Sequence, residues 1–102
     1  MGRLAMARIS LDTRVSPSPD VVCREVGGEL VLLDLESASY FGLNEVGSRM
    51  WTLLGELGVL RGVCDTIERE YAVPRARLEE DLLSLVRALR DKGLVDVAGE
   101  GA

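Results

Sequence analysis

Three neighbouring carboxylates and two cysteines are the candidates for catalytic or metal-binding side chains in this chain. Glu79, Glu80 and Asp81 are consecutive, so on a helix they point to different sides. We expect them to stabilise a helix N-terminus, not to form an acid–base pair. Cys23 and Cys64 form no C-x-x-C pair, and the chain contains no histidine to activate a thiol or complete a zinc site. We therefore expect two buried thiols, and no catalytic residue, metal or cofactor.

Length, charge and hydropathy exclude further functional classes. A chain of 102 residues forms one domain with a single core. Its net charge of −5 argues against a nucleic-acid-binding face, because such faces neutralise phosphates with lysine and arginine. No apolar run approaches the roughly 20 residues of a membrane helix, and the N-terminus lacks the apolar core of a signal peptide. These observations predict a cytoplasmic protein with neither a membrane nor a nucleic-acid partner.

The first half of the chain predicts a three-stranded meander. Residues 9–14 alternate weakly and predict a short strand, after which two prolines break the chain. Residues 21–26 carry β-branched side chains, and the Gly-Gly pair that follows suits a hairpin turn. Strands over 29–35 and 39–43 come next. The segment 39–43 is then the third strand and lies at one edge of an antiparallel sheet.

The second half predicts three helices. Asn44 suits the N-cap of the first helix, and apolar residues recur behind it at helical spacing. That buried stripe comprises Val46, Met50, Leu53, Leu54 and Leu57, with Trp51 beside it in the core. The second helix covers about residues 59–71. The third follows Pro74, ends at Gly93, and precedes a short strand over 94–97.

Together these elements predict an α+β domain of the winged helix-turn-helix type over residues 20–97. A partly flexible segment 1–19 precedes the domain, and a disordered tail 98–102 follows it. A winged helix raises a DNA-binding regulator as an alternative, with the third helix in the major groove. The charges of that helix nearly cancel, with Arg75, Arg77, Arg87, Arg90 and Lys92 against Glu79, Glu80, Asp81 and Asp91. Acids near its N-terminal end would repel phosphates, so a solvated mixed-charge face fits better.

Two runs of the sequence resemble the PqqD-like family of precursor-peptide recognition domains. They are LVLLDLESASYFGLNEVGSRMW and IEREYAVPRARLEEDLLSLVRALRDKGLV, within residues 21–97. The most telling pieces are the pattern Tyr40-Phe41-x-Leu43-Asn44-x-x-Gly47-x-x-x-Trp51, then Asp81, then Gly93-Leu94. Within the family, Asp34-Leu35 and Trp51 look most like the standalone recognition proteins of lasso peptide clusters. The member that serves pyrroloquinoline quinone synthesis is the alternative.

The resemblance implies a function. Family members bind the leader of a ribosomally made precursor as a strand added to the third strand, in a groove walled by the third helix. They present the precursor to a separate leader peptidase, in lasso systems a cysteine protease, and to a cyclase. An edge strand supplies the unpaired backbone groups for this mode of binding. We expect the edge to be Ser39, Tyr40, Phe41, Gly42 and Leu43.

The strand and helix patterns lead to a hypothesis about which side chains would contact the leader. Tyr40 and Leu43 would wall a hydrophobic groove together with Leu82, Leu85, Val86 and Leu89. Arg87 and Arg90 would pair with acidic leader residues. Strand register decides which residues face the groove, because a slip of one residue exchanges the faces. The alternative for each apolar residue is ordinary core. Trp51 is assigned to the core and Asp81 to a helix terminus.

Overall fold

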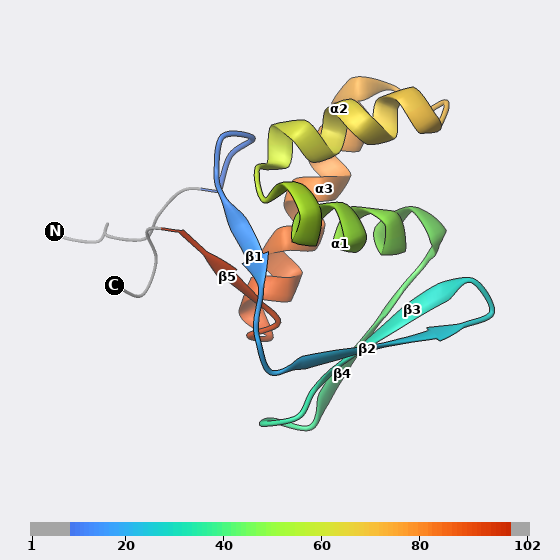
Figure 1. Cartoon of the computed structure of the whole chain (residues 1–102). Coiled ribbons are helices and arrows are strands. Elements are labelled where there is room, and N and C mark those ends of the chain that lie inside the picture. Colours follow the sequence, from blue (N-terminus) through green and yellow to red (C-terminus); the bar gives the residue numbers. More distant parts are fainter. Residues whose placement is uncertain (1–8, 99–102) are drawn as a thin grey trace, which may run out of the picture.

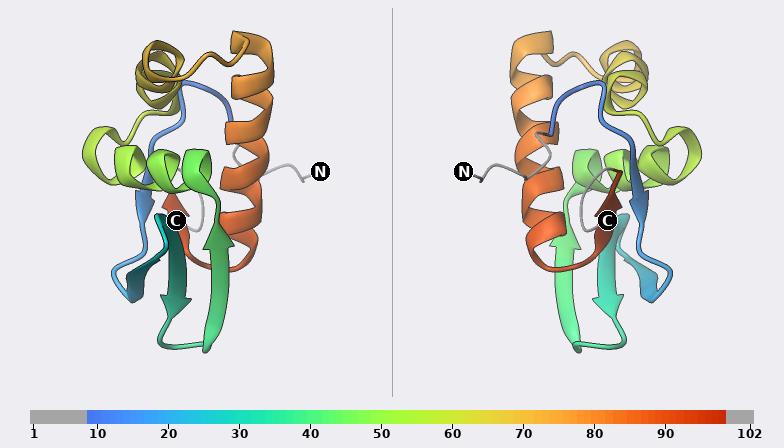
Figure 2. Two further views of the ribbon diagram at one scale, coloured as in Figure 1. Left: turned by 90° about the vertical axis from the view of Figure 1, so that its right-hand side faces the viewer. Right: turned by 90° about the vertical axis from the view of Figure 1, so that its left-hand side faces the viewer.

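The computed structural model describes residues 9–98. It contains β1 (Val15–Pro17), β2 (Val21–Val26), β3 (Glu29–Asp34), β4 (Ser39–Leu43), α1 (Glu45–Leu57), α2 (Leu60–Glu70), α3 (Arg75–Asp91) and β5 (Val95–Val97). Strands β2, β3 and β4 form an antiparallel sheet in that order, and β1 pairs with β5 in a second, two-stranded sheet. Figure 1 shows α1 above the three-stranded sheet. Figure 2 shows α3 on the β4 side of that sheet. The predicted α+β architecture, with its meander followed by three helices, is confirmed.

Two turns set the register of the meander. Gly27 and Gly28 join β2 to β3 with φ angles of 61° and 86°, which glycine adopts at little cost. The turn from β3 to β4 is built around Asp34, whose carboxylate accepts hydrogen bonds from the backbone N–H of Glu36 and the hydroxyl of Ser37, both at 3.0 Å. Ala38 closes this turn with a φ of 60°. The register that results pairs Leu30 of β3 with Leu43 of β4.

Helix α1 begins directly after β4; one side chain caps the helix and another attaches it to the sheet. The Asn44 side chain caps α1 by accepting a hydrogen bond from the N–H of Gly47 at 2.8 Å, as the sequence predicts. The buried Ser48 hydroxyl accepts from the N–H of Leu30 at 2.9 Å and lies 3.3 Å from the carbonyl oxygen of Leu43, to which it donates. Ser48 therefore links α1 to the last pair of residues in the β3–β4 ladder.

The core lies between the inner face of the sheet, the three helices and the β1–β5 pair. Every helix contributes an apolar stripe to it, and Trp51 is among its members, as predicted. The residues exposed by 1% or less are Val15, Leu32, Leu54, Leu60, Val63, Cys64, Ile67, Leu78, Leu82, Val86, Leu89 and Leu94. Among the helices of residues 9–98, none is long and apolar enough to cross a membrane.

The N-terminal segment differs from its prediction. Residues 11–12 form a turn, and the short strand lies at Val15–Pro17, not at 9–14. The sequence suggested a break at Pro17, but β1 belongs to a two-stranded sheet and a strand with a free edge tolerates the missing N–H. Val15 is 1% exposed, so residues before position 20 form part of the domain. Ala98, placed in the tail, donates its N–H to the Arg14 carbonyl at 2.9 Å. The expected flexibility of 1–8 and disorder of 99–102 lie outside the described residues.

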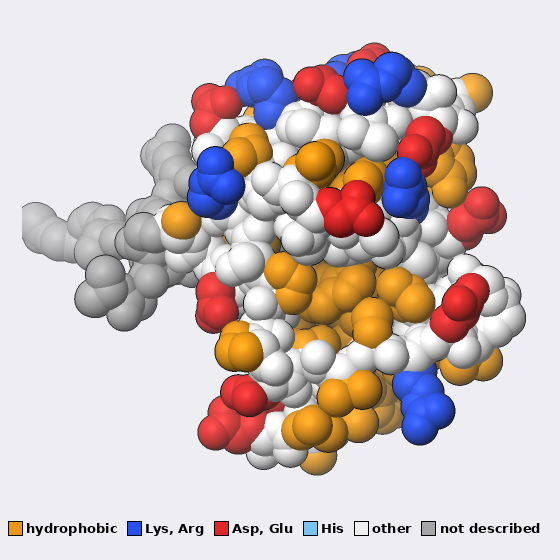
Figure 3. All heavy atoms as spheres, viewed as in Figure 1, with side chains coloured by type: hydrophobic (Ala, Val, Ile, Leu, Met, Phe, Trp, Pro, Cys, Tyr) orange, Lys and Arg blue, Asp and Glu red, His pale blue; other side chains and the backbone are white. Residues whose placement is uncertain are grey.

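One of the two thiol predictions is wrong. Cys64 is buried, as expected, whereas Cys23 is exposed. Cys23 lies on β2, which is an outer strand of its sheet, so no further strand covers it. Figure 3, which views the molecule with β2 in front, shows hydrophobic side chains at the surface between α1 and the sheet. The inner face of the sheet is thus incompletely covered on the β2 side.

Candidate functional site

The outer edge of β4 is unpaired within the part of the chain that the structure describes. β4 bonds to β3 along one edge only, and the N-terminal strand β1 pairs with β5 instead. The opposite edge of the sheet, on β2, is also unpaired there, but it carries Arg24 and Glu25. Charged side chains protect an edge from strand addition, and β4 has none. The edge of β4 is therefore the one suited to accept another strand.

Alternation along β4 decides which side chains face the helices. Phe41 is partly buried and Leu43 is 4% exposed, so both lie on the inner face. Tyr40 is 73% exposed on the outer face, together with Gly42. The expectation that Tyr40 walls the groove beside Leu43 is wrong, and Phe41 takes that place. The physical reason is the two-residue period: with Leu43 in the core, every second residue of β4 faces inward.

A groove runs beside this edge between β4, the start of α1 and α3. Its cavity measures about 350 Å³ and is lined by Phe41, Gly42, Leu43, Asn44, Val46, Gly47, Met50, Asp81 and Leu85. Leu85 is partly buried and is the one α3 residue of the predicted wall that lines this cavity. Apolar side chains and polar groups share the lining, with the polar side chains coming from Asn44 and Asp81. Such a groove suits an extended peptide with apolar anchors.

Three other residues that were assigned to the groove belong to the core. Leu82, Val86 and Leu89 are each 0% exposed, so no ligand can contact them in this structure. Their spacing follows the stripe by which α3 packs on the rest of the domain, and Leu85 lies to the side of that stripe. These three residues are therefore ordinary core residues, which was the alternative given for them from the sequence.

Sequence reasoning missed the contribution of α1 to the groove. Val46, Gly47 and Met50 line it because the first turns of α1 flank the strand from which the helix emerges. A side chain at Gly47 would place its Cβ 3.2 Å from Asn44 Oδ1 and 3.5 Å from Leu43 Cδ2, so glycine permits the close approach of helix and strand. A glycine within the first turn of a helix was the available signal.

The acidic residues of α3 do not stabilise its N-terminus as predicted, because Glu79, Glu80 and Asp81 lie beyond the first turn. The first turn of α3 contains no acidic residue, so these acids do not serve the helix dipole. Asp81 lines the groove and its carboxylate lies 3.2 Å from Arg77 Nε, one helical turn away. Arg87 is exposed, and Arg90 is partly buried with its Nη2 3.4 Å from Asp91 Oδ1. Neither of these two arginines lines the cavity.

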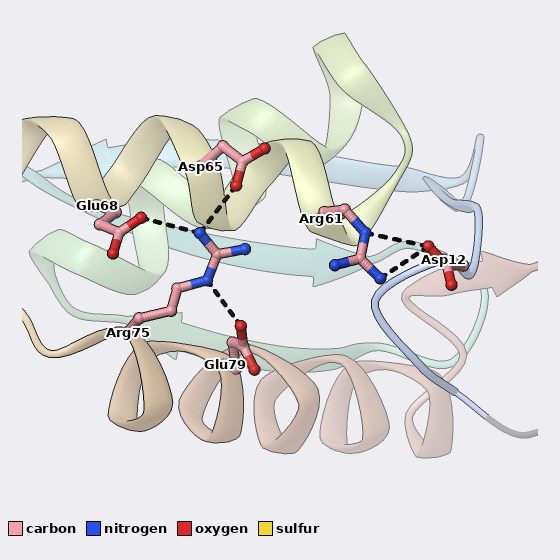
Figure 4. Close-up of polar contacts among 6 residues, drawn as sticks. All are labelled: Asp12, Arg61, Asp65, Glu68, Arg75 and Glu79. Atoms are coloured by element: carbon pink, nitrogen blue, oxygen red, sulfur yellow. Dashed lines mark hydrogen bonds and ion pairs between the residues drawn. The ribbon is translucent and has the colours of Figure 1, made fainter.

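Arg75 fixes the position of α3 against α2. Figure 4 shows its guanidinium between Asp65 and Glu68 of α2 and Glu79 of α3. The distances are 2.8, 2.9 and 2.7 Å respectively. These carboxylates, Asp65 foremost, raise the pKa of Arg75. This ion-pair cluster links α2 to α3, the helix that carries Leu85 and Asp81. Arg75 is thereby paired with protein carboxylates, whereas a DNA-binding helix would present such an arginine to phosphates.

The two thiols are poor nucleophiles. Burial raises the pKa of Cys64, and loss of water around the thiol also raises the pKa of Cys23. The thiolate is the reactive form, so both shifts reduce its population at neutral pH.

The fold and the open edge define a small α+β domain with a peptide-sized groove. The chain belongs to the PqqD family: the family model described as "Coenzyme PQQ synthesis protein D (PqqD)" matches residues 29–95. The family resemblance drawn from the sequence is thereby confirmed. No curated protein sequence matches this chain significantly.

Two solved structures share the fold. One is described as TbiB1 in complex with the TbiA(beta) leader peptide, at 41% sequence identity and a TM-score of 0.73, covering 85% of this chain and 96% of that chain. The other is described as lasso peptide synthetase B1 complexed with the leader peptide, at 25% identity and a TM-score of 0.73, covering 81% of this chain and 98% of that chain. Both similar proteins bind leader peptides, which does not favour the DNA-binding alternative.

Proposed function

We propose that this protein binds the leader segment of a ribosomally synthesised precursor peptide in lasso peptide maturation. The leader adds as a strand to the free edge of β4 and lies in the groove between β4 and α3. The observation that carries this proposal is the uncharged edge of β4, unpaired among residues 9–98, directly beside a cavity of about 350 Å³ whose walls include Phe41, Met50 and Leu85. The solved structures of similar proteins with leader peptides support it.

Backbone and side-chain contacts have separate roles in this complex. The unpaired N–H and C=O groups of β4 bond to the leader backbone, and each such bond contributes about 0.5–1.5 kcal/mol net. Leader side chains that face inward enter the cavity against Phe41, Met50 and Leu85, and each large apolar one contributes about 1.5–3 kcal/mol. A leader loses conformational freedom when it binds, so several contributions are needed for a complex of about −8 to −10 kcal/mol.

The protein then acts as a carrier and not as an enzyme. It hands the bound precursor to a separate leader peptidase of the cysteine protease type and to a cyclase, in the cytoplasm. The chemistry of its own residues supports this role, because the chain has no histidine and the pKa of both thiols is raised.

A charge placed in the groove tests the proposal. Leu85→Glu puts a carboxylate where the leader would bury apolar surface, and we expect binding of the TbiA(beta) leader peptide to fall by about 100-fold. Leu57→Glu is the matched control, because Leu57 is a helix-surface leucine, 43% exposed, that does not line this cavity. Affinity is measured by calorimetric titration, with thermal unfolding to confirm the fold of both variants. Equal affinity of the two variants would contradict the groove assignment.

The second candidate is a peptide chaperone of pyrroloquinoline quinone synthesis, which the description of the matching family favours. The same groove would then hold a different precursor. A competition titration between the TbiA(beta) leader and the precursor of that cofactor separates the two. Tighter binding of the lasso leader supports the first candidate, and tighter binding of the cofactor precursor supports the second.

A further inference from the structure

The outer face of the sheet has an empty place at its open edge. Register puts Arg24, Val31 and Gly42 in one row across β2, β3 and β4 on this face. A Cβ built on Gly42 would meet no atom within 4 Å. A depression of about 260 Å³ surrounds this position, and it is lined by Val26, Glu29, Leu30, Val31, Gly42, Leu43 and Asn44. It lies on the face opposite Phe41, and Gly42 contributes to both cavities.

A strand added to β4 must present side chains to both faces. Successive residues of a strand alternate, so each leader residue next to an inward anchor projects onto the outer face. The leader residue paired with Gly42 would find no side chain opposite it on β4. Cross-strand neighbours contribute to the stability of a sheet, and a large side chain on one strand can cover a glycine on the next.

We propose that the depression over Gly42 is a second side-chain subsite, which takes one large apolar residue of the leader. This inference rests on the proposed leader binding at β4. The side chain lies over Gly42 toward Val31, with Tyr40 beside it on the same strand. Val26 and Val31 supply apolar walls, and the exposed Glu29 at the rim disfavours an acidic residue. The leader is then recognised on both faces of the sheet, by an inward anchor near Leu85 and an outward residue one position away.

Filling the space over Gly42 tests the subsite. Gly42 does not have the positive φ that would exclude other residues, and its surroundings are open, so Gly42→Val should fold. Its branched side chain occupies the place assigned to the leader residue. Gly42→Ala is the milder second variant, and Val22→Ala is the control, because Val22 is exposed on the same face but does not line the depression. Thermal unfolding checks the fold of each variant.

The measurement is an alanine scan of the TbiA(beta) leader peptide, titrated against the wild type and each variant. We expect one peptide position at which alanine weakens binding to the wild type about 10-fold but weakens binding to Gly42→Val by less than about 2-fold. Gly42→Ala should show a smaller coupling at the same position, and Val22→Ala none. This position should adjoin, in the peptide, one that is coupled in the same way to Leu85→Ala.

The outcomes separate this inference from the function on which it rests. Saturable binding that is sensitive to Leu85, with no peptide position coupled to Gly42, overturns the subsite alone. Coupling at a position that does not adjoin the Leu85-coupled one also overturns it. A wild-type protein that does not bind the leader overturns the proposed function, and the subsite with it.

Discussion

Replacing Ser48 by alanine should destabilise the domain and loosen the edge strand. The Ser48 side chain bonds to the N–H of Leu30 and the carbonyl of Leu43, at 2.9 and 3.3 Å, and the residue is 8% exposed. These two backbone groups belong to paired residues at the end of the β3–β4 ladder. Ser48→Ala removes both bonds and leaves a donor and an acceptor without this partner in a poorly hydrated place.

The expected loss is substantial for a domain of this size. Each buried group that loses its partner costs about 1–3 kcal/mol, and some water entry reduces the sum, so we expect a loss of about 2–4 kcal/mol. A domain of 60–100 residues loses roughly 4–8 °C in Tm for each kcal/mol, which predicts a fall of at least about 8 °C. Because Leu43 also lines the groove, binding of the TbiA(beta) leader should weaken as well.

Thr52→Ala is the matched control on the same helix. Its hydroxyl donates to the Ser48 carbonyl at 3.1 Å within α1, and Thr52 is exposed, so its loss leaves no buried group unpaired. Alanine also favours a helix more than threonine does. Thermal and urea unfolding, followed by circular dichroism, measure both variants. If Ser48→Ala stays within about 0.5 kcal/mol of the wild type, the link between α1 and the sheet does not have the assigned role.

Two further predictions concern the turn before β4 and the response to acid. Ala38 has a φ of 60°, so Ala38→Gly should raise stability by about 0.5–1 kcal/mol, measured by urea unfolding, and a loss of stability would contradict the assigned strain. A hydrogen bond from Arg49 lowers the pKa of Glu70, so the pair contributes stability above the unfolded-state pKa of about 4.3 and loses it as pH falls through the folded value. Urea midpoints measured from pH 6 to 3 should therefore fall less steeply for Glu70→Gln than for the wild type, and parallel curves would refute this contribution.

The faces on which the β4 side chains lie could have been predicted from the sequence. Asn44 marks the start of α1, and Leu43 before it must enter the core as the chain turns into the helix. Alternation then places Phe41 on the inner face and Tyr40 on the outer face. The register stays ambiguous only when the strand and the helix cap are considered separately.

The assignment of α3 failed for a different reason. Leu82, Leu85, Val86 and Leu89 are all apolar and close together on one helix, so their types do not distinguish a core residue from a groove residue. Only the packing of α3 against α1, α2 and β5 separates the fully buried three from the partly exposed Leu85. The wrong prediction for Cys23 has the same cause. Its exposure depends on which strand lies at the edge of the sheet and on what covers that strand.

Short-range sequence features specify the local elements of this protein: the glycine and Asp34 turns, the Asn44 cap and the helical stripes. These follow from interactions between residues a few positions apart, which the order of residue types specifies directly. Long-range packing specifies the rest, namely the pairing of Val15–Pro17 with Val95–Val97, the edge position of β4, the share of each helix in the core, and the two cavities on either side of β4. Those features depend on contacts between distant segments, and the free energies of these contacts are determined only when the whole chain packs.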